Sequence, residues 1–96
     1  MKKDFTLEVF AENNFNILNR MINAFNRRRI RIKYLTAYEM EDDFHTGVAR
    51  FVLYTTEENM SKVRAQVEKF IEVEHTVLHD GAEAYFSKPG KTIQNS

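Results

Sequence analysis

Hydrophobic and other residues alternate near the start of the chain. Over residues 5–10, the side chains of Leu7 and Val9 lie on the same side as Phe5. Because successive side chains of an extended chain point to opposite faces, this period of two predicts a β-strand. The polar segment at residues 11–14 contains asparagines that are suited to helix capping, so we expect a helix to begin directly after it.

A helical period follows this turn. Apolar side chains recur at spacings of one, three and four over residues 17–25, which predicts an amphipathic helix. Alternation returns over residues 30–38, where Arg31 and Lys33 occupy the polar positions, and it predicts a second strand. The acidic and polar residues 39–46 predict a hairpin loop that is longer than a two-residue turn.

The second half of the chain repeats the order of strand, helix and strand. Residues 48–54 alternate and predict a third strand, and Thr55 with Glu58 has the spacing of a capping box at the start of a second helix. Residues 73–77 alternate again and predict a fourth strand. The apolar stripe predicted for the second helix consists of Met60, Val63, Val67, Phe70 and Ile71.

The element order β-α-β-β-α-β predicts an α+β fold of the ferredoxin-like type, a four-stranded antiparallel sheet with two helices on one face. We assign residues 1–79 to this domain and residues 80–96 to a C-terminal tail. In the tail we expect a short extra strand over residues 82–86 and a loose end from residue 87 onward. Large side chains expected on the open face of the sheet are Phe10, Tyr34, Val52 and Tyr54. They predict that a second copy covers this face or extends the sheet edge, and hence a homodimer.

Composition limits the class of protein. The chain has 96 residues, which is enough for one domain with one core. Its hydrophobic fraction of 43% and charged fraction of 29% fit a folded globular protein. Cysteine is absent, which excludes disulfides and thiolate metal sites and fits a cytoplasmic location. Because no apolar stretch is long enough for a signal peptide or a membrane span, we expect no membrane association.

The sequence offers no catalytic constellation. Its three glycines are scattered, so a glycine-rich phosphate loop is missing. His45, His75 and His79 fall in a loop and a strand, where their side chains are not expected to converge on a metal ion. The neighbouring Asp42 and Asp43 are interpreted as solvated loop residues rather than as an acid-base pair. We therefore expect no catalytic residue, no metal site and no cofactor.

Basic side chains are concentrated at residues 27–33. Such a run is able to meet phosphate groups, and RNA-binding modules share the ferredoxin-like plan, so nucleic-acid binding is one alternative function. The same residues also fit a helix C-terminus, where cations complement the helix dipole, and an edge strand, where charges prevent unwanted pairing. A net charge of +0 and the missing aromatic RNA-binding motif count against nucleic acid.

Several segments resemble the ACT domain of the small subunit of acetolactate (acetohydroxyacid) synthase. The family pattern E-N-x-x-G-x-L-x-R is similar to ENNFNILNR at residues 12–20, and F-x-x-R-x-x-N-I-x-S-L-T is similar to FNRRRIRIKYLT at residues 25–36. Further on, ARFVL at residues 49–53 resembles the third strand of the family, and residues 63–78 resemble its second helix and last strand. The resemblance extends over residues 4–79, most of the chain.

The resemblance implies a regulatory subunit without catalytic activity of its own. Two copies would pair through their edge strands, and a branched-chain amino acid would bind between the first β-α loop of one copy and the second strand of the other. The partner would be the large, thiamine-diphosphate-dependent catalytic subunit of acetolactate synthase. The effector positions that the resemblance implies are Asn13, Asn14, Phe15, Asn16, Ile17, Leu18 and Arg31.

The chain departs from the family pattern at three positions. Asn16 replaces the glycine of the first loop, Arg29 replaces the glycine of the helix-to-strand turn, and Arg31 replaces the asparagine of the second strand, whereas Asn13 is retained. A side chain at position 16 occupies space that glycine leaves for a ligand, and an arginine at position 31 has the geometry to pair with a carboxylate. A stand-alone or degenerate amino-acid-binding ACT dimer with another partner is therefore an alternative.

Overall fold

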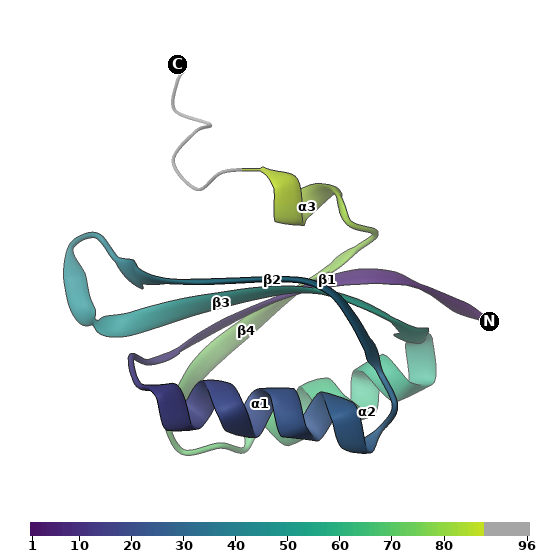
Figure 1. Cartoon of the computed structure of the whole chain (residues 1–96), viewed down its shortest axis with the longest axis horizontal. Helices are drawn as coiled ribbons and strands as arrows, with labels where there is room; N and C mark the ends of the chain where they lie inside the picture. Colours follow the sequence, from purple (N-terminus) through teal and green to yellow (C-terminus); the bar gives the residue numbers. More distant parts are fainter. Residues whose placement is uncertain (88–96) are drawn as a thin grey trace.

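The computed structural model of the protein describes residues 1–87 of the chain (Figure 1). Over these residues the elements follow one another in the order β-α-β-β-α-β-α. Their bounds are β1 (Lys2–Glu12), α1 (Phe15–Arg27), β2 (Arg31–Met40), β3 (Asp43–Thr56), α2 (Glu57–Glu68), β4 (Val73–Asp80) and α3 (Glu83–Phe86). The first six elements have the predicted order, and α3 is added to them.

The strands form one antiparallel sheet in the order β2-β3-β1-β4. Both α1 and α2 lie on the same face of this sheet, as Figure 1 shows. The central strand β1 pairs with β3 along its whole length, from Lys2 opposite Thr56 to Glu12 opposite Thr46. The predicted ferredoxin-like fold is confirmed, and β2 and β4 form the two edges of the sheet.

The core lies between the sheet and the two long helices. The predicted inward residues of β1, namely Phe5, Leu7 and Val9, are at most 2% exposed. The ring of Phe25 on α1 meets Phe51 on β3 edge-on, with 4.8 Å between the ring centroids. Full burial of a side chain of this size contributes about 1.5–3 kcal/mol to folding, so these apolar faces determine how the layers stack. The α2 residues that complete the core are Met60, Val63 and Val67.

Side-chain caps begin both long helices. Asn14 Oδ1 accepts a hydrogen bond from the Ile17 backbone N–H at 3.0 Å, as expected for the polar turn after the first strand. The cap of α2 is Thr56, whose Oγ1 accepts from the Asn59 N–H at 3.1 Å. The predicted capping box at Thr55 is therefore one residue too early, because Thr55 is still a buried, paired residue of β3.

Two predictions about element ends are wrong. Residues 39–46 were expected to form a long loop, but β2 continues to Met40 and β3 already starts at Asp43. The Asp43 carboxylate accepts hydrogen bonds from the His45 N–H and the Thr46 hydroxyl, which support the extended chain. This exposed hairpin tip lies outside the core, so its strands need no apolar alternation. Ile71, expected in the α2 stripe, follows the end of that helix and is 93% exposed.

The chain after β4 also differs from its prediction. Residues 83–86 form the short helix α3 instead of a strand, and α3 lies on the face of the sheet opposite to α1 and α2 (Figure 1). Gly81 has a φ of 74°, and its N–H donates to the Asp4 carbonyl oxygen, so the chain leaves β4 and turns back across the sheet. The loose end expected from residue 87 lies, beyond Ser87, outside the described residues.

α3 covers part of the sheet face that was expected to be open. Val52 is fully buried, and the ring of Tyr34 lies 5.4 Å from that of Tyr85 and 5.2 Å from that of Phe86. The chain's own C-terminal segment therefore provides some of the cover that was expected from a second copy.

Candidate functional site

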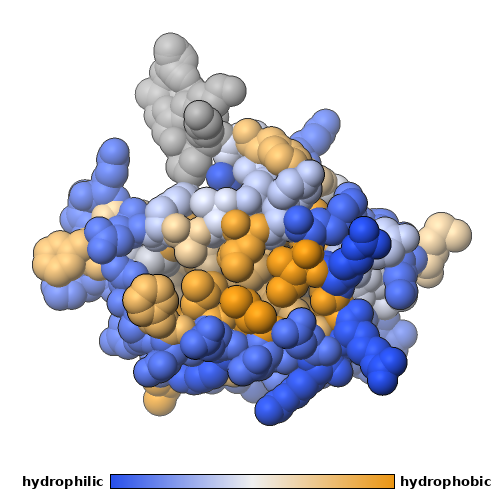
Figure 2. All heavy atoms as spheres, viewed as in Figure 1, coloured by the Kyte–Doolittle hydropathy of each residue, from blue (hydrophilic) through white to orange (hydrophobic). Residues whose placement is uncertain are grey.

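An open pocket lies between the start of α1 and the edge strand β2. Its volume is about 450 Å³, within the range of about 300–1,000 Å³ that is typical of small-molecule sites. Figure 2 shows exposed apolar surface in the region between β2 and α1. The pocket is lined by β1 and the loop after it (Val9, Ala11, Glu12, Asn13, Asn14), by α1 (Phe15, Ile17, Leu18, Met21), by β2 (Ala37, Tyr38, Glu39) and by β3 (Gly47, Val48, Ala49).

Small residues in two neighbouring rows of the sheet create this hollow. Strand pairing places alanines and a glycine of three adjacent strands side by side on the face that carries α1. Because these side chains fill little volume, the first turns of α1 do not close the space above them. The first row consists of Val9, Ala49 and Ala37, and the second row consists of Ala11, Gly47 and Glu39.

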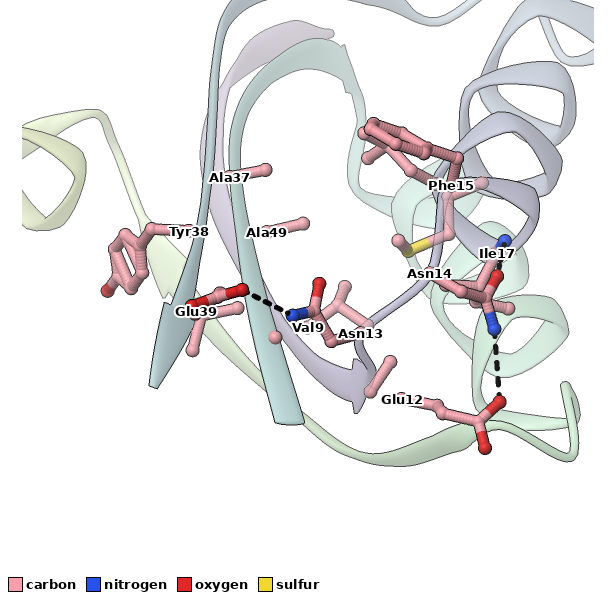
Figure 3. A pocket seen from close by; sticks show the side chains of 15 residues that line it. Val9, Glu12, Asn13, Asn14, Phe15, Ile17, Ala37, Tyr38, Glu39 and Ala49 are labelled. Atoms are coloured by element: carbon pink, nitrogen blue, oxygen red, sulfur yellow. Dashed lines mark hydrogen bonds between the residues drawn. The ribbon is translucent and has the colours of Figure 1, made fainter. Parts of the chain in front are cut away.

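Asn13 ties the first loop to the β2-β3 hairpin. Its Nδ2 donates to Glu39 Oε2 at 3.2 Å (Figure 3) and to the Phe44 carbonyl oxygen at 2.9 Å. Its backbone N–H donates to the His45 carbonyl oxygen at 2.9 Å. Both hydrogens of the side-chain amide are engaged, and its Oδ1 lies over Gly47, 3.4 Å from where a Cβ would be.

Asn14 and Glu12 form the other half of this loop. While Asn14 Oδ1 caps α1, its Nδ2 donates to Glu12 Oε1 at 3.0 Å. Figure 3 shows that this bond holds the Glu12 carboxylate away from the pair formed by Asn13 and Glu39. The loop is therefore held in place by both asparagines before any ligand binds.

The charge at the pocket is negative. Glu12 and Glu39 are the charged residues that line it, and none of the lining residues is Lys, Arg or His. Leu18 and Met21 contribute apolar walls on the α1 side. Within the part of the chain that the structure describes, the site thus combines an apolar body with a polar, acidic mouth, which suits a small amphiphilic molecule.

Most, but not all, of the effector positions that the resemblance implies gather here. Asn16 is exposed on the first turn of α1 and does not line the pocket. Arg31 lies at the far end of β2, where it pairs with Tyr54 and its guanidinium is 5.8 Å from the centre of that ring. The role of all seven positions in ligand binding stays a prediction. Those that line the pocket are Asn13, Asn14, Phe15, Ile17 and Leu18.

Sequence reasoning missed the contribution of the β2-β3 hairpin. Glu39 was assigned to a loop, and no role was given to Ala37, Gly47 or Ala49. The available signal was the small size of the residues at alternate positions on two predicted strands. Only the register of those strands shows that the small residues lie side by side.

A second polar cluster lies beneath α3 on the opposite face of the sheet. Arg50 is 7% exposed. Its Nε lies 2.9 Å from Glu8 Oε2, so the two side chains form an ion pair. The Nε–H of Arg50 is not aligned for a hydrogen bond to this oxygen. The Arg50 guanidinium also donates to the Ala84 carbonyl oxygen, and His79 Nε2 lies 3.3 Å from Glu8 Oε1. Burial raises the pKa of the neighbouring Tyr38 phenol; the positive charge of Arg50 opposes this rise and the Glu8 carboxylate adds to it. These groups pair with one another, so we assign them to the fold.

Polar contacts within the chain engage two residues of the basic run. Arg28 Nε donates to Gln66 Oε1 at 3.2 Å, and Lys33 Nζ pairs with Asp4 Oδ2 at 3.1 Å. The Asp4 carboxylate offsets the charge of Lys33, and both contacts favour the structural interpretation of the run.

Among residues 1–87, no group of three or more His, Cys, Asp or Glu side chains is arranged to hold a metal ion. No helix in this part of the chain has the length and apolar character needed to cross a membrane.

Comparison with solved structures shows the fold. The ACT domain of a GTP pyrophosphokinase from Chlorobium tepidum is similar with a TM-score of 0.68 and 8% identity, over 81% of this chain and 99% of that one. The small subunit of acetolactate synthase from Thermotoga maritima has a TM-score of 0.69 and 17% identity, over 79% of this chain and 47% of that one. The C-terminal domain of the MgtC protein from Mycobacterium tuberculosis has a TM-score of 0.70 and 12% identity, over 88% of this chain and 94% of that one. No protein-family model matches the chain, and no curated protein matches its sequence. The chain therefore has the ferredoxin-like fold of ACT domains.

Proposed function

We propose that this protein is a non-catalytic regulatory domain of the ACT type, which binds a small molecule in the pocket between α1 and β2. The observation that carries the proposal is the position of the pocket. It lies at the first β-α loop, where the resemblance places the effector site, and five of the seven implied positions line it. A fold by itself does not specify function, so the argument rests on this site.

The ligand that we propose is a branched-chain amino acid. Its side chain would pack against the apolar walls formed by Val9, Leu18 and Met21. Its polar end would face the loop at Asn13. This orientation places apolar atoms against apolar atoms and leaves the charged groups at the open mouth, as expected for a small amphiphilic ligand.

We infer that two copies pair through β2. This edge strand has 10 residues, and Tyr34 and Leu35 on it are 47% and 40% exposed. An exposed strand edge with apolar side chains favours the addition of another strand. If two β2 strands pair antiparallel about a centre between residues 35 and 36, Arg31 of one copy lies opposite Met40 of the other. Arg31 lies over Tyr54, on the sheet face opposite to the pocket, so this arrangement brings its backbone and not its guanidinium toward the pocket end of the second copy.

Filling the pocket tests the proposed site. Ala37 is exposed on the edge strand, so Ala37→Leu adds volume to the pocket without entering the core. We expect calorimetry to detect valine, leucine or isoleucine binding to the wild type, and Ala37→Leu to weaken that binding by about tenfold or more. Ala65→Leu, at an exposed position of α2, is the matched control. Equal affinities of both variants and the wild type would contradict the placement of the site.

The finer proposal is that the chain is the small regulatory subunit of acetolactate synthase or a paralogue of it. The resemblance over residues 4–79 and the likeness to the Thermotoga maritima small subunit support this identity. Addition of the chain to a purified large subunit should change the rate of the synthase and its inhibition by branched-chain amino acids. If neither changes while the chain still binds an amino acid, the stand-alone ACT dimer is the better description.

A further inference from the structure

At the polar end of the pocket, Asn13 and Glu39 present oxygen atoms rather than donors. Asn13 uses both hydrogens of Nδ2, toward Glu39 Oε2 at 3.2 Å and the Phe44 carbonyl oxygen at 2.9 Å, so its amide offers only Oδ1. Glu39 adds a carboxylate at the end of the row that contains Ala11 and Gly47. Figure 3 shows the side chains of Asn13 and Glu39 directed toward each other.

No basic side chain of the same chain lines the pocket to balance this carboxylate. Elsewhere in the described residues, Lys33 is held by Asp4 at 3.1 Å and Arg28 by Gln66 at 3.2 Å. A carboxylate attracts a cation and repels an anion. The charge of the pocket therefore complements a positively charged ligand.

We propose that Glu39 recognises the ammonium group of the ligand, and that the pocket takes an apolar primary amine whether or not the amine also carries a carboxylate. This inference rests on the proposed function and adds the specificity-determining residue to it. The hydrogen bond from Asn13 holds the Glu39 carboxylate in place before binding, which lowers the cost of ordering it. Of the two acidic lining residues, Glu12 is the weaker candidate because Asn14 holds its carboxylate away from this pair.

Three probes with the same apolar body separate the two charges of an amino acid. Leucine carries both, 3-methylbutylamine lacks the carboxylate, and 4-methylpentanoate lacks the ammonium group. For the wild type, we expect calorimetry to give the amine an affinity within about tenfold of that of leucine. The affinity of the acid should be at least about tenfold lower than that of leucine. Glu39→Gln keeps the shape of the side chain and an acceptor for Asn13, and it should abolish the preference for the amine over the acid.

Glu41→Gln is the matched control, because it removes the same charge from the turn of the same hairpin, outside the pocket. It should retain the wild-type preference. Equal binding of amine and acid to the wild type, or an unchanged preference in Glu39→Gln, would overturn the role of Glu39 and leave an amino-acid pocket in place. If none of the three probes binds the wild type, the proposed function fails and this inference fails with it.

Sedimentation of Glu39→Gln provides a second readout. In a β2-paired dimer, Glu39 lies on the strand that forms the interface, so its carboxylate would be able to serve assembly instead of ligand recognition. A Glu39→Gln variant that keeps the wild-type sedimentation profile and loses the amine preference supports the proposal. Loss of the dimer with an unchanged preference would overturn it.

Discussion

Arg29 shows how tertiary packing holds one residue in a costly conformation. Its φ is 59°, in the left-handed region that glycine adopts most easily. The end of α1 requires this conformation, because the Arg29 N–H donates to the Asn26 carbonyl oxygen and the Ile30 N–H to that of Phe25. Ile30 and Phe25 are both buried in the core, so the turn is fixed despite a cost of about 1–2 kcal/mol for a residue with a Cβ.

Arg29→Gly should raise the free energy of unfolding by about 1 kcal/mol, since the relief of backbone strain exceeds the added flexibility of the unfolded chain. Urea unfolding followed by circular dichroism would measure the change. Arg27→Gly, in the helical last turn of α1, should lower the free energy of unfolding by about 1 kcal/mol. If both variants are destabilised alike, position 29 is not strained.

At the scale of elements, α3 depends on the sheet for its existence. A helix of 4 residues is far too short to be stable alone in water, so its contacts must hold it. The Thr6 hydroxyl donates to the Gly81 carbonyl oxygen at 2.8 Å, and Arg50 donates to the carbonyl oxygen of Ala84. In return, α3 shields the ion pair of Arg50 with Glu8 from water.

A chain that ends at Asp80 should be less stable than the full chain by about 1–3 kcal/mol, because it loses the cover over Val52 and one hydrogen-bond acceptor of Arg50. The midpoint of urea unfolding would measure this difference. A chain that ends at Ser87 keeps α3 and is the control. Equal stability of the two truncated chains would show that α3 does not support the sheet.

At the scale of the whole molecule, the edge strand β2 keeps apolar side chains accessible. The helices cover one face of the sheet and α3 covers part of the other, whereas Tyr34 and Leu35 remain 47% and 40% exposed at the edge. The formal net charge of the chain is +0, so copies do not repel one another strongly. Both properties favour association along this edge.

Leu35→Lys should weaken the dimer by about tenfold or more, because a charge on an edge strand opposes pairing with another strand. Analytical ultracentrifugation over a range of concentrations would measure the dimer dissociation constant. Ile71→Lys makes the same kind of change at a site that is 93% exposed beyond the end of α2, and it should leave the constant unchanged. A wild-type chain that is monomeric at high concentration would contradict pairing through β2.

The element order and the inward faces were predictable because they follow from local periodicity. The alternation of Phe5, Leu7 and Val9 and the helical spacing that ends at Phe25 are properties of short segments, and each segment buries its apolar side wherever it packs. Predictions failed at residues 39–46 and 82–86, where no apolar period constrains the chain. In those segments, hydrogen bonds from Asp43 and the turn at Gly81 decide the conformation.

The sequence by itself determined the β-α-β-β-α-β order, the composition of the core and the asparagine-rich loop at the first helix. Only the tertiary structure decided that this loop borders a pocket and that Glu39 belongs to it. Asn13 and Glu39 are 26 residues apart in the chain, and Ala37 meets Ala49 only through the register of β2 with β3. Local periodicity carries no information about register between strands, because register is set by the pairing and packing of the whole sheet.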